Sequence, residues 1–401
     1  MTDDPTVWIW MPLGILLALP SLPGTIELAL LTLGGILQPR RARAAPAPRP
    51  IGRLAVLVPA HDEADQIART VAGLLDCVPG EGGFEVVVIA DNCTDATAER
   101  ARAAGARVLE RQDPARRGKG YALDFAFQAL LDEPFDGFIV VDADTRVEPN
   151  LILASRRAMH EGAAAVQCAY RIDNPEAGPR ARLMGIAWMA FNVLRPRGRE
   201  RWGLSVGILG NGFGLTRETL RAVPYEASSV VEDLEYHLRL VGSGRRVVFV
   251  PDTSVWTDAP LSRGGGASQR ARWEGGRFRM IRDWTPRLLR RVLAGERRLT
   301  EPMLELLLLP LAYHILLLLL ALLPPFGPTR LYALFGLALV GVHVLAAIRV
   351  AGGDRRDLLA LAGAPFYILW KLTVLRAIGR ASRADADWVR TARDPGSRDP
   401  S

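Results

Sequence analysis

The sequence predicts an α/β protein in which a mainly parallel sheet lies between apolar segments long enough to cross a membrane. Three observations support this fold class. Strand-like and helix-like patterns alternate between residues 51 and 300, which favours parallel strands joined by right-handed crossovers. A short apolar run at 138–141 leads directly into Asp142 and Asp144. Long apolar stretches occupy the first forty residues and the region after residue 300.

The composition also indicates contact with a membrane. The chain has 401 residues, of which 49% are hydrophobic, and a formal net charge of +7. Many arginines stand beside apolar segments, which favours the cytoplasmic face of a membrane over a nucleic-acid-binding surface, and we find no nucleic-acid motif. The three cysteines fit no zinc or iron–sulfur spacing, so we expect a reducing compartment and no structural disulfide.

Residues 1–38 are predicted to form an N-terminal transmembrane segment. Residues 7–37 are almost wholly apolar, and at about 1.5 Å per residue such a helix exceeds the thickness of a bilayer. Pro20, Pro23 and Gly24 predict a kink or a short interfacial helix before the span. Arginines without acidic neighbours follow in the basic Ala/Pro linker at 39–50, which places this flank in the cytoplasm and the N-terminus outside.

Residues 51–300 are predicted to form one cytoplasmic domain. Short apolar runs predict strands at 54–58, 84–90, 106–109 and 138–141. Apolar residues at helical spacing predict helices at 63–75, 94–104 and 119–131. No Gly-x-Gly-x-x-Gly follows the first strand, so the chain lacks the fingerprint of a redox-type dinucleotide-binding fold.

Acidic residues follow three of these four strands. Glu63 comes after the first strand, Asp91 after the second, and Asp142 and Asp144 after the fourth. The carboxyl ends of parallel strands meet at one edge of a sheet, where open α/β sheets bind ligands. Carboxylates accept hydrogen bonds from ribose hydroxyls and base N–H groups, and Mg²⁺ bridges carboxylates to phosphates. The edge therefore suits a nucleotide, although each motif alone is also typical of an acidic turn.

Two loops could serve the same ligand. Residues 116–120 carry arginines, glycines and Lys119, and offer donors for phosphate near a helix N-terminus. Residues 205–214 are rich in glycine, which lets backbone approach a ligand closely. A solvated basic loop and a plain turn are the simpler interpretations.

Two helical motifs follow. Glu232 and Asp233 open a predicted helix, where acids stabilise the helix dipole or where one carboxylate acts as a general base. Gln269, Arg272 and Trp273 have the spacing of one helix face. Arginine can bind a pyrophosphate through two hydrogen bonds, and tryptophan offers a flat face to a sugar ring.

Residues 301–380 are predicted to contain transmembrane and interfacial helices. The segment 303–323 is interrupted only by the polar Glu305 and His314, so we expect a span there, followed by a tight turn at 324–328 and a return span at 331–350. The segment 358–370 is short for a span and contains Pro365, which favours an interfacial or re-entrant helix. Residues 381–401 are expected to be a cytoplasmic tail.

In this order the motifs resemble those of family 2 glycosyltransferases of the GT-A fold, especially membrane-embedded polysaccharide synthases of the cellulose and hyaluronan synthase type. The resemblance covers about 54–285. It implies a Rossmann-like GT-A sheet, a nucleotide-sugar donor, expected to be a UDP-sugar, and Mg²⁺ or Mn²⁺ as cofactor.

The resemblance also implies roles for single residues. Asp233 would be the base that deprotonates the acceptor hydroxyl, and Asp144 would bind the metal. The remaining site residues fall into a donor-nucleotide group, Glu63, Asp91, Lys119 and Asp142, and a pyrophosphate and acceptor group, Glu232, Gln269, Arg272 and Trp273. The chain departs from the family pattern at Asp62, Asn92, Asp124 and Val231, where Asn, Gly, Asn and Thr are usual.

The activity implied is a single displacement with inversion at the anomeric carbon, serving cell-surface or exopolysaccharide synthesis at the inner (plasma) membrane. The acceptor would be a lipid or a glycan. Because the predicted spans are few for a secretion channel, we also expect an export partner. Three alternatives remain: single-transfer synthesis of a lipid-linked sugar or glycolipid, a nucleotidyltransferase that releases pyrophosphate, and a catalytically weak membrane scaffold of GT-A shape.

Overall fold

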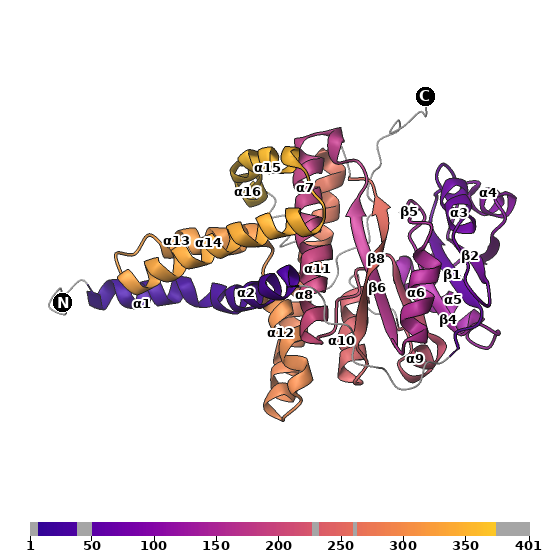
Figure 1. The fold of residues 1–401 in the computed structure, drawn as a ribbon, viewed down its shortest axis with the longest axis horizontal. Helices are drawn as coiled ribbons and strands as arrows, with labels where there is room; N and C mark the ends of the chain where they lie inside the picture. Colours follow the sequence, from indigo (N-terminus) through magenta and orange to yellow (C-terminus); the bar gives the residue numbers. More distant parts are fainter. Residues whose placement is uncertain (1–6, 38–49, 227–231, 260–262, 374–401) are drawn as a thin grey trace.

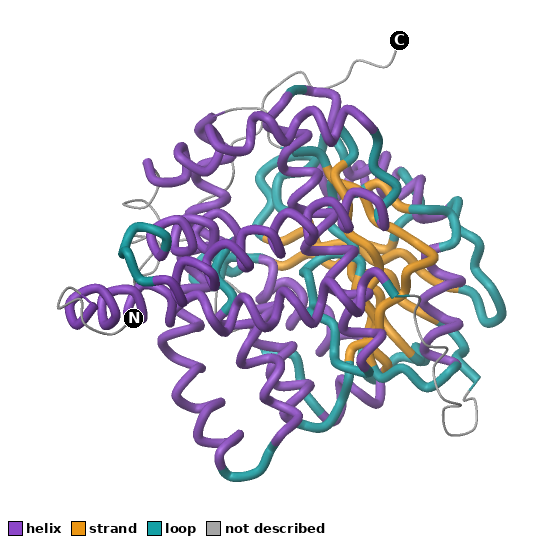
Figure 2. The backbone as a smooth tube through the Cα atoms, turned by 60° about the vertical axis from the view of Figure 1, so that its left-hand side comes forward, coloured by secondary structure: helices purple, strands orange, loops and turns teal. Residues whose placement is uncertain are grey.

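The computed structural model describes residues 7–37, 50–226, 232–259 and 263–373. A sheet-containing domain lies at one end of the molecule, and an arm of apolar helices extends from the other (Figure 1). After rotation by 60° the strands are still gathered on one side, with helices filling the rest (Figure 2).

In the part of the chain that the structure describes, the sheet has eight strands in the order β3-β2-β1-β4-β7-β6-β8-β5. Their bounds are β1 Leu54–Ala60, β2 Phe84–Asp91, β3 Arg107–Arg111, β4 Gly137–Val140, β5 Arg146–Val147, β6 Ala165–Ile172, β7 Phe213–Thr216 and β8 Val247–Thr257. β1 pairs in parallel with β2 and β4, β2 with β3, and β6 with β8. β7 is antiparallel to β4 and β6, and β5 to β8. The predicted α/β fold with a mainly parallel sheet is confirmed.

Helices cover both faces of the sheet, so its central strands are apolar throughout rather than alternating. In β1, Ala55 and Leu57 belong to one buried cluster, with α5 (Lys119–Leu130). Leu54, Val56 and Val58 belong to the other, with α3 (Ile67–Leu75). The remaining helices that flank the sheet domain are α4 (Thr97–Ala103), α6 (Leu151–His160), α7 (Pro179–Met189), α8 (Arg195–Trp202), α9 (Arg217–Ala222), α10 (Glu232–Gly242) and α11 (Arg263–Leu293).

Two helices begin later than predicted. α3 begins at Ile67 rather than at residue 63, because residues 63–66 form a turn in which the Glu63 carbonyl accepts hydrogen bonds from the N–H groups of Gln66 and Ile67. α4 begins at Thr97 rather than at residue 94, and the Asp95 carboxylate accepts from the Thr97 N–H at 3.0 Å. In both loops the polar residues after the strand stabilise a turn instead of joining the helix.

Within the described residues, two stretches are long and apolar enough to cross a membrane. The first is Trp8–Ile36, built from α1 (Val7–Ala18), a 3₁₀ turn at Leu19–Ser21 and α2 (Leu22–Ile36). The second is α14 (Gly327–Val350). They lie side by side in the arm (Figure 1). The break expected at Pro20 is a single 3₁₀ turn within the first stretch.

The segment 303–323, for which a span is expected, is not one continuous helix. α12 (Thr300–Leu307) and α13 (Leu311–Ala321) meet at an angle of 78°, so the pair is either a broken span or a re-entrant loop. Pro310 stands at the break with ψ of 133°, because proline has no N–H for the helix and its ring clashes with the preceding turn. After α14, the segment 355–373 forms three short elements, α15 (Arg355–Ala360), a 3₁₀ turn and α16 (Ala364–Thr373). The predicted tail lies outside the described residues.

Arg156 of α6 fixes the entrance to the first two strands. The side chain is buried, and its guanidinium donates to the carbonyls of Ile51 at 2.8 Å, Gly83 at 2.6 Å and Pro79 at 3.1 Å, and to that of Gly52. One cation therefore satisfies backbone acceptors from two segments that precede β1 and β2.

We predict that Arg156→Met destabilises the protein by about 2 kcal/mol, because it leaves these carbonyls without their donor. The melting temperature of the purified chain in detergent should fall by roughly 5 °C. The neighbouring Arg157 is the matched control: its side chain is 79% exposed and pairs with Glu161, so Arg157→Met should change stability by less than about 0.5 kcal/mol. Equal shifts for the two variants would contradict the assigned role of Arg156.

Candidate active site

The carboxyl ends of β1, β2 and β4 lie at one edge of the sheet. β1 stands between the other two, with Ala60 opposite Ala90 and Leu57 opposite Val140. The acidic segments that follow these strands therefore emerge side by side. The structure brings together the three strand ends that the sequence had singled out.

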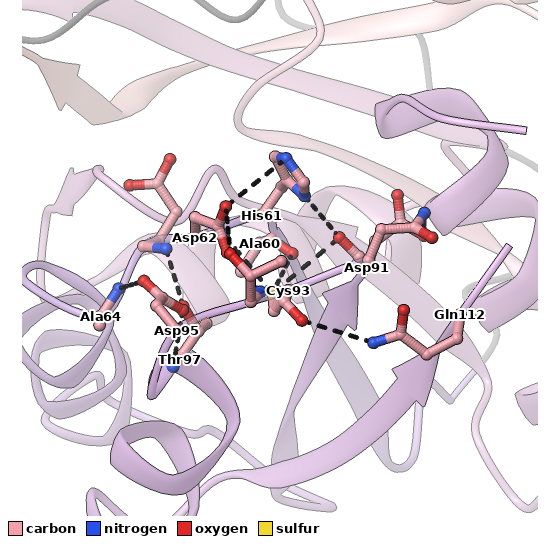
Figure 3. A network of polar contacts seen from close by, with 12 residues as sticks. Ala60, His61, Asp62, Ala64, Asp91, Cys93, Asp95, Thr97 and Gln112 are labelled. Carbon is pink, nitrogen blue, oxygen red and sulfur yellow. Dashed lines mark hydrogen bonds and ion pairs between the residues drawn. The ribbon is translucent and has the colours of Figure 1, made fainter. Parts of the chain in front are cut away.

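The loops after β1 and β2 are interlocked by hydrogen bonds (Figure 3). A ring nitrogen of His61 lies 2.8 Å from the Asp91 carbonyl, and the Asp62 carboxylate accepts from the Thr94 N–H at 2.7 Å. Asp62 and Asn92 both have φ of 53°. Asp and Asn tolerate this left-handed region better than other residues with a side chain, so both departures from the family pattern suit the turns in which they occur.

Figure 3 also shows a group that resembles a metal site. Ligand atoms of Asp62, Cys93 and Asp95 lie within 4.8 Å of one another. However, the Asp95 carboxylate accepts from the N–H groups of Ala64, at 3.1 Å, and Thr97, at 3.0 Å. These bonds and those of Asp62 account for the group as a brace between two loops, and we assign no cation to it.

Asp91 is held by an arginine that the sequence analysis did not identify. Arg111 donates to Asp91 Oδ1 at 2.6 Å, and both side chains are buried, with 9% and 6% exposed. Arg111 also pairs with Asp113 at 3.0 Å, and Asn92 donates to the same Asp91 oxygen at 3.0 Å. The third strand was predicted to end at residue 109, whereas β3 extends to Arg111, directly opposite Asp91. Recognising that register would have identified the pair.

Lys119 lies at the centre of the site. It begins α5 after Gly118, whose φ is 125°. Its ammonium group donates to the Asp142 carboxylate and, at 2.6 Å, to the carbonyl of Gly210. The basic loop at 116–120 and the glycine-rich loop at 205–214 thus meet beside Asp142. The prediction that both loops serve one ligand requires this proximity.

Asn211 joins the glycine-rich loop to the acidic pair from the other side. This fully buried residue accepts from the Asp142 N–H at 3.1 Å and donates to Thr145 Oγ1 at 2.8 Å. It fixes the backbone on both sides of Asp144. Its side chain was not predicted to take part, since the sequence indicated only the glycines around it.

Asp233 reaches the same place from the first turn of α10. A Cβ added to Gly210 would lie 3.3 Å from Asp233 Oδ2 and 3.9 Å from Lys119 Nζ. A side chain at this position would therefore crowd both Asp233 and Lys119. Desolvation raises the pKa of the Asp233 carboxyl, and the negative charge of Asp142 raises it further. The Leu234 N–H, at 2.8 Å, and the charge of Lys119 oppose this effect.

Aromatic side chains line the two acidic pairs. Burial raises the pKa of Tyr170, on β6, well above its ordinary value, and the charges of Asp142 and Asp144 add to this effect. Burial likewise raises the pKa of Tyr225 well above its ordinary value, with the charges of Glu232 and Asp233 adding to it. Each phenol therefore stays neutral beside a pair of carboxylates.

The other predicted residues are placed less completely. Glu63 lies in the loop after β1, where its N–H donates to Thr97 Oγ1 at 2.8 Å. Gln269, Arg272 and Trp273 lie on the helical backbone of α11, as their spacing predicted. Their side chains are outside what the structure describes, so their predicted contacts stay predictions.

The donor set at β4 fits a divalent cation. Asp142 and Asp144 offer hard oxygen ligands on either side of one residue at a strand end, which is the chemistry that Mg²⁺ and Mn²⁺ prefer. Lys119 already neutralises Asp142, so Asp144 is the carboxylate best suited to hold the ion.

Comparison with known proteins agrees with this geometry. The family model described as "Glycosyltransferase like family 2" matches residues 50–276. The chain is 25% identical over 233 residues to the probable glycosyltransferase YdaM of Bacillus subtilis (strain 168), covering 56% of this chain and 55% of that protein. It is 32% identical over 193 residues to glucosyl-3-phosphoglycerate synthase of Mycolicibacterium paratuberculosis (strain ATCC BAA-968 / K-10), covering 45% of this chain and 57% of that enzyme. The chain thus spans little more than half the length of these two relatives.

A solved structure resembles nearly the whole chain. The mannosyltransferase PcManGT from Pyrobaculum calidifontis, in complex with GDP-Man and Mn²⁺, aligns with a TM-score of 0.55 and 17% identity over 93% of this chain and 97% of that one. This likeness shows a common GT-A-like fold. The family model matches more than half of the residues of this chain, so the chain belongs to the glycosyltransferase-like family 2.

Proposed function

We propose that the protein is a membrane-bound inverting glycosyltransferase that moves a sugar from a nucleotide-sugar donor to an acceptor hydroxyl. One observation carries the proposal: Lys119 joins Asp142, just after β4, to the carbonyl of Gly210, and the Asp233 carboxyl lies beside the same glycine. Asp142, which suits the donor, and Asp233, which suits a general base, therefore both lie beside one position. A nucleotidyltransferase would have no use for the second of these.

The donor side is proposed to lie on β1, β2 and β4. Glu63 and Asp91 would bind the nucleoside, with Arg111 holding Asp91 in place. Asp144 would hold Mg²⁺ or Mn²⁺, and the ion, when bound, stabilises negative charge on the departing diphosphate. The mannosyltransferase of similar fold was solved with GDP-Man and Mn²⁺, which supports this assignment. Lys119 adds a fixed positive charge at the same place.

The acceptor side is proposed to lie on α10 and α11. Asp233 would take the proton of the acceptor hydroxyl as its oxygen bonds to the anomeric carbon and the bond from that carbon to the diphosphate breaks. Attack opposite the leaving group inverts the configuration. The raised pKa of Asp233 suits a general base, because proton transfer is most effective when the pKa lies nearer the working pH. Glu232, Gln269, Arg272 and Trp273 would hold the diphosphate and the acceptor.

The setting we propose is the cytoplasmic face of the inner membrane, anchored by Trp8–Ile36 and α14. Cell-surface or exopolysaccharide synthesis is the proposed role. One observation favours a second candidate, single-transfer synthesis of a lipid-linked sugar: the described residues contain two candidate spans, or three if the bent pair crosses. That is few helices for a polymer channel without an export partner.

The direct test supplies the full-length protein in lipid nanodiscs with labelled sugar nucleotides, one at a time. We expect label from one UDP-sugar to enter a lipid or polymer fraction, with release of a nucleoside diphosphate. Transfer should stop with EDTA and return with Mn²⁺ or Mg²⁺, and Asp144→Asn should abolish the metal response. Product length separates polymer synthesis from a single transfer. No binding and no transfer of any donor would favour the inactive scaffold.

We predict that Asp233→Asn lowers kcat about 10³-fold, because the amide cannot accept the proton. The dissociation constant of the donor should change little, since the donor side is carried by other elements. Glu235→Gln is the matched control on the same helix. It lies about 200° around the helix from Asp233, and its activity should equal that of the wild type. An active Asp233→Asn enzyme would exclude Asp233 as the base.

The pH dependence should report the same carboxyl. Because the base works only when ionised, kcat/KM should fall as the pH drops through the pKa of Asp233. That pKa is raised above the ordinary value of 3.8, so the acid limb should lie at a higher pH than an exposed aspartate would give. In the Asp233→Asn variant, the residual kcat/KM should not show this fall at acid pH. A limb that persists in the variant would assign it to another group.

A further inference from the structure

Buried charges gather where the membrane helices meet the sheet domain. Arg199, on α8, donates to Glu27 of α2 at 3.1 Å and to Glu301 of α12, and lies 3.2 Å from Glu305 of α12. Only 2% of its side chain is exposed, and Glu27 is 1% exposed. One guanidinium thus binds carboxylates from two helices that are far apart in the sequence.

Two more arginines complete the group, which we call the Arg199 cluster: Glu27, Arg195, Arg199, Arg277, Glu301 and Glu305. Arg277, on α11, donates to the Glu305 carbonyl, and Arg195 is buried one turn before Arg199. The cluster therefore holds three cations and three anions and is balanced when all are ionised. His237 lies near it and adds no charge, because burial lowers its pKa to about 4.

Stability alone is a poor reason for such a cluster. Charges removed from water lose much hydration, and apolar side chains of similar size are often at least as stabilising. Glu27 also lies within a candidate membrane span, where ionisable residues are costly and mark a function by default. What ion pairs add to apolar packing is a directional link between the helices that carry them.

The two helices proposed to carry the acceptor side of the site, α10 and α11, lie next to the cluster. His237 stands four residues after Asp233 on α10, and Arg277 four residues after Trp273 on α11, so each is one turn from a proposed site residue. Leu238 of α10, Met280 of α11 and Leu306 of α12 share one buried apolar cluster. In contrast, β1 and β2, which carry donor-side residues, lie on the far side of the sheet domain from α2 and α12 (Figure 1).

We propose that Arg199 is a positioning residue for sugar transfer: by locking α2 and α12 to α8, it holds α10 and α11 in place against the donor side. This inference rests on the proposed function and deepens it. It makes the membrane helices part of the catalytic geometry rather than an anchor only. Loss of the lock should slow transfer while leaving donor binding intact.

The test separates charge balance from position. With all carboxyls ionised, Arg199→Met leaves one excess negative charge. Arg199→Met with Glu27→Gln restores two cations against two anions but keeps α2, α8 and α12 untied. We expect the double variant in nanodiscs to regain most of the melting temperature lost by the single variant. Its kcat should stay at least about tenfold below the wild type, with the donor dissociation constant within about twofold. Recovery of kcat together with stability would overturn the inference.

Hydrogen exchange gives a readout that does not need turnover. Amides of α10 and α11 should exchange faster in the double variant, while those of α5 stay unchanged. Unchanged exchange in α10 would overturn the positioning role even if the wild type transferred no sugar, a result that would count separately against the proposed function. Should the double variant fail to fold, Glu301→Gln is the milder change, expected to lower kcat about threefold. Arg156→Met, a buried arginine outside the cluster, should lower stability without lowering kcat.

Discussion

The contact of Lys119 with Asp142 and Gly210 is the interaction on which the site depends. Asp142 and Asp233 belong to elements far apart in the sequence, and the charge of each disfavours the charge of the other. The ammonium group of Lys119 contacts Asp142, and its charge also acts on Asp233, so it offsets that repulsion while holding the glycine-rich loop. Without a cation there, the carboxyl ends of the strands and the start of α10 would tend to separate.

Other acidic side chains at this edge of the sheet also have a hydrogen-bond donor or a cation beside them. Asp91 is neutralised by Arg111, and Asp62 is bound by backbone and hydroxyl donors of Thr94. Asp91, Asp62 and Asp142 thus have partners before any ligand arrives. The proposed nucleotide and cation would therefore meet carboxylates that are already partly neutralised and a backbone that is already fixed, which would lower the reorganisation needed during transfer.

Local patterns predicted the fold well, because buried strands, helix periodicity and acidic strand ends are all written in neighbouring residues. What they missed is non-local. Arg111 meets Asp91 only through the register of β2 and β3, and Asn211 meets Asp142 only because β7 pairs with β4. The break at Pro310 was different, since its signal was present in the sequence but was outweighed by the hydropathy of the segment around it.

The Arg199 cluster was equally invisible, because its charges come from segments that the sequence assigns to separate regions. Glu27 interrupts an apolar span for no evident local reason, and Arg199 is one of several arginines on α8. A guanidinium shared by Glu27, Glu301 and Glu305 is satisfied only when α2, α8 and α12 keep one arrangement. The proposed site must align α10 and α11 with the sheet, so it gains from a contact that fits only one arrangement of the helices. For this reason we regard the Arg199 cluster as part of the catalytic design.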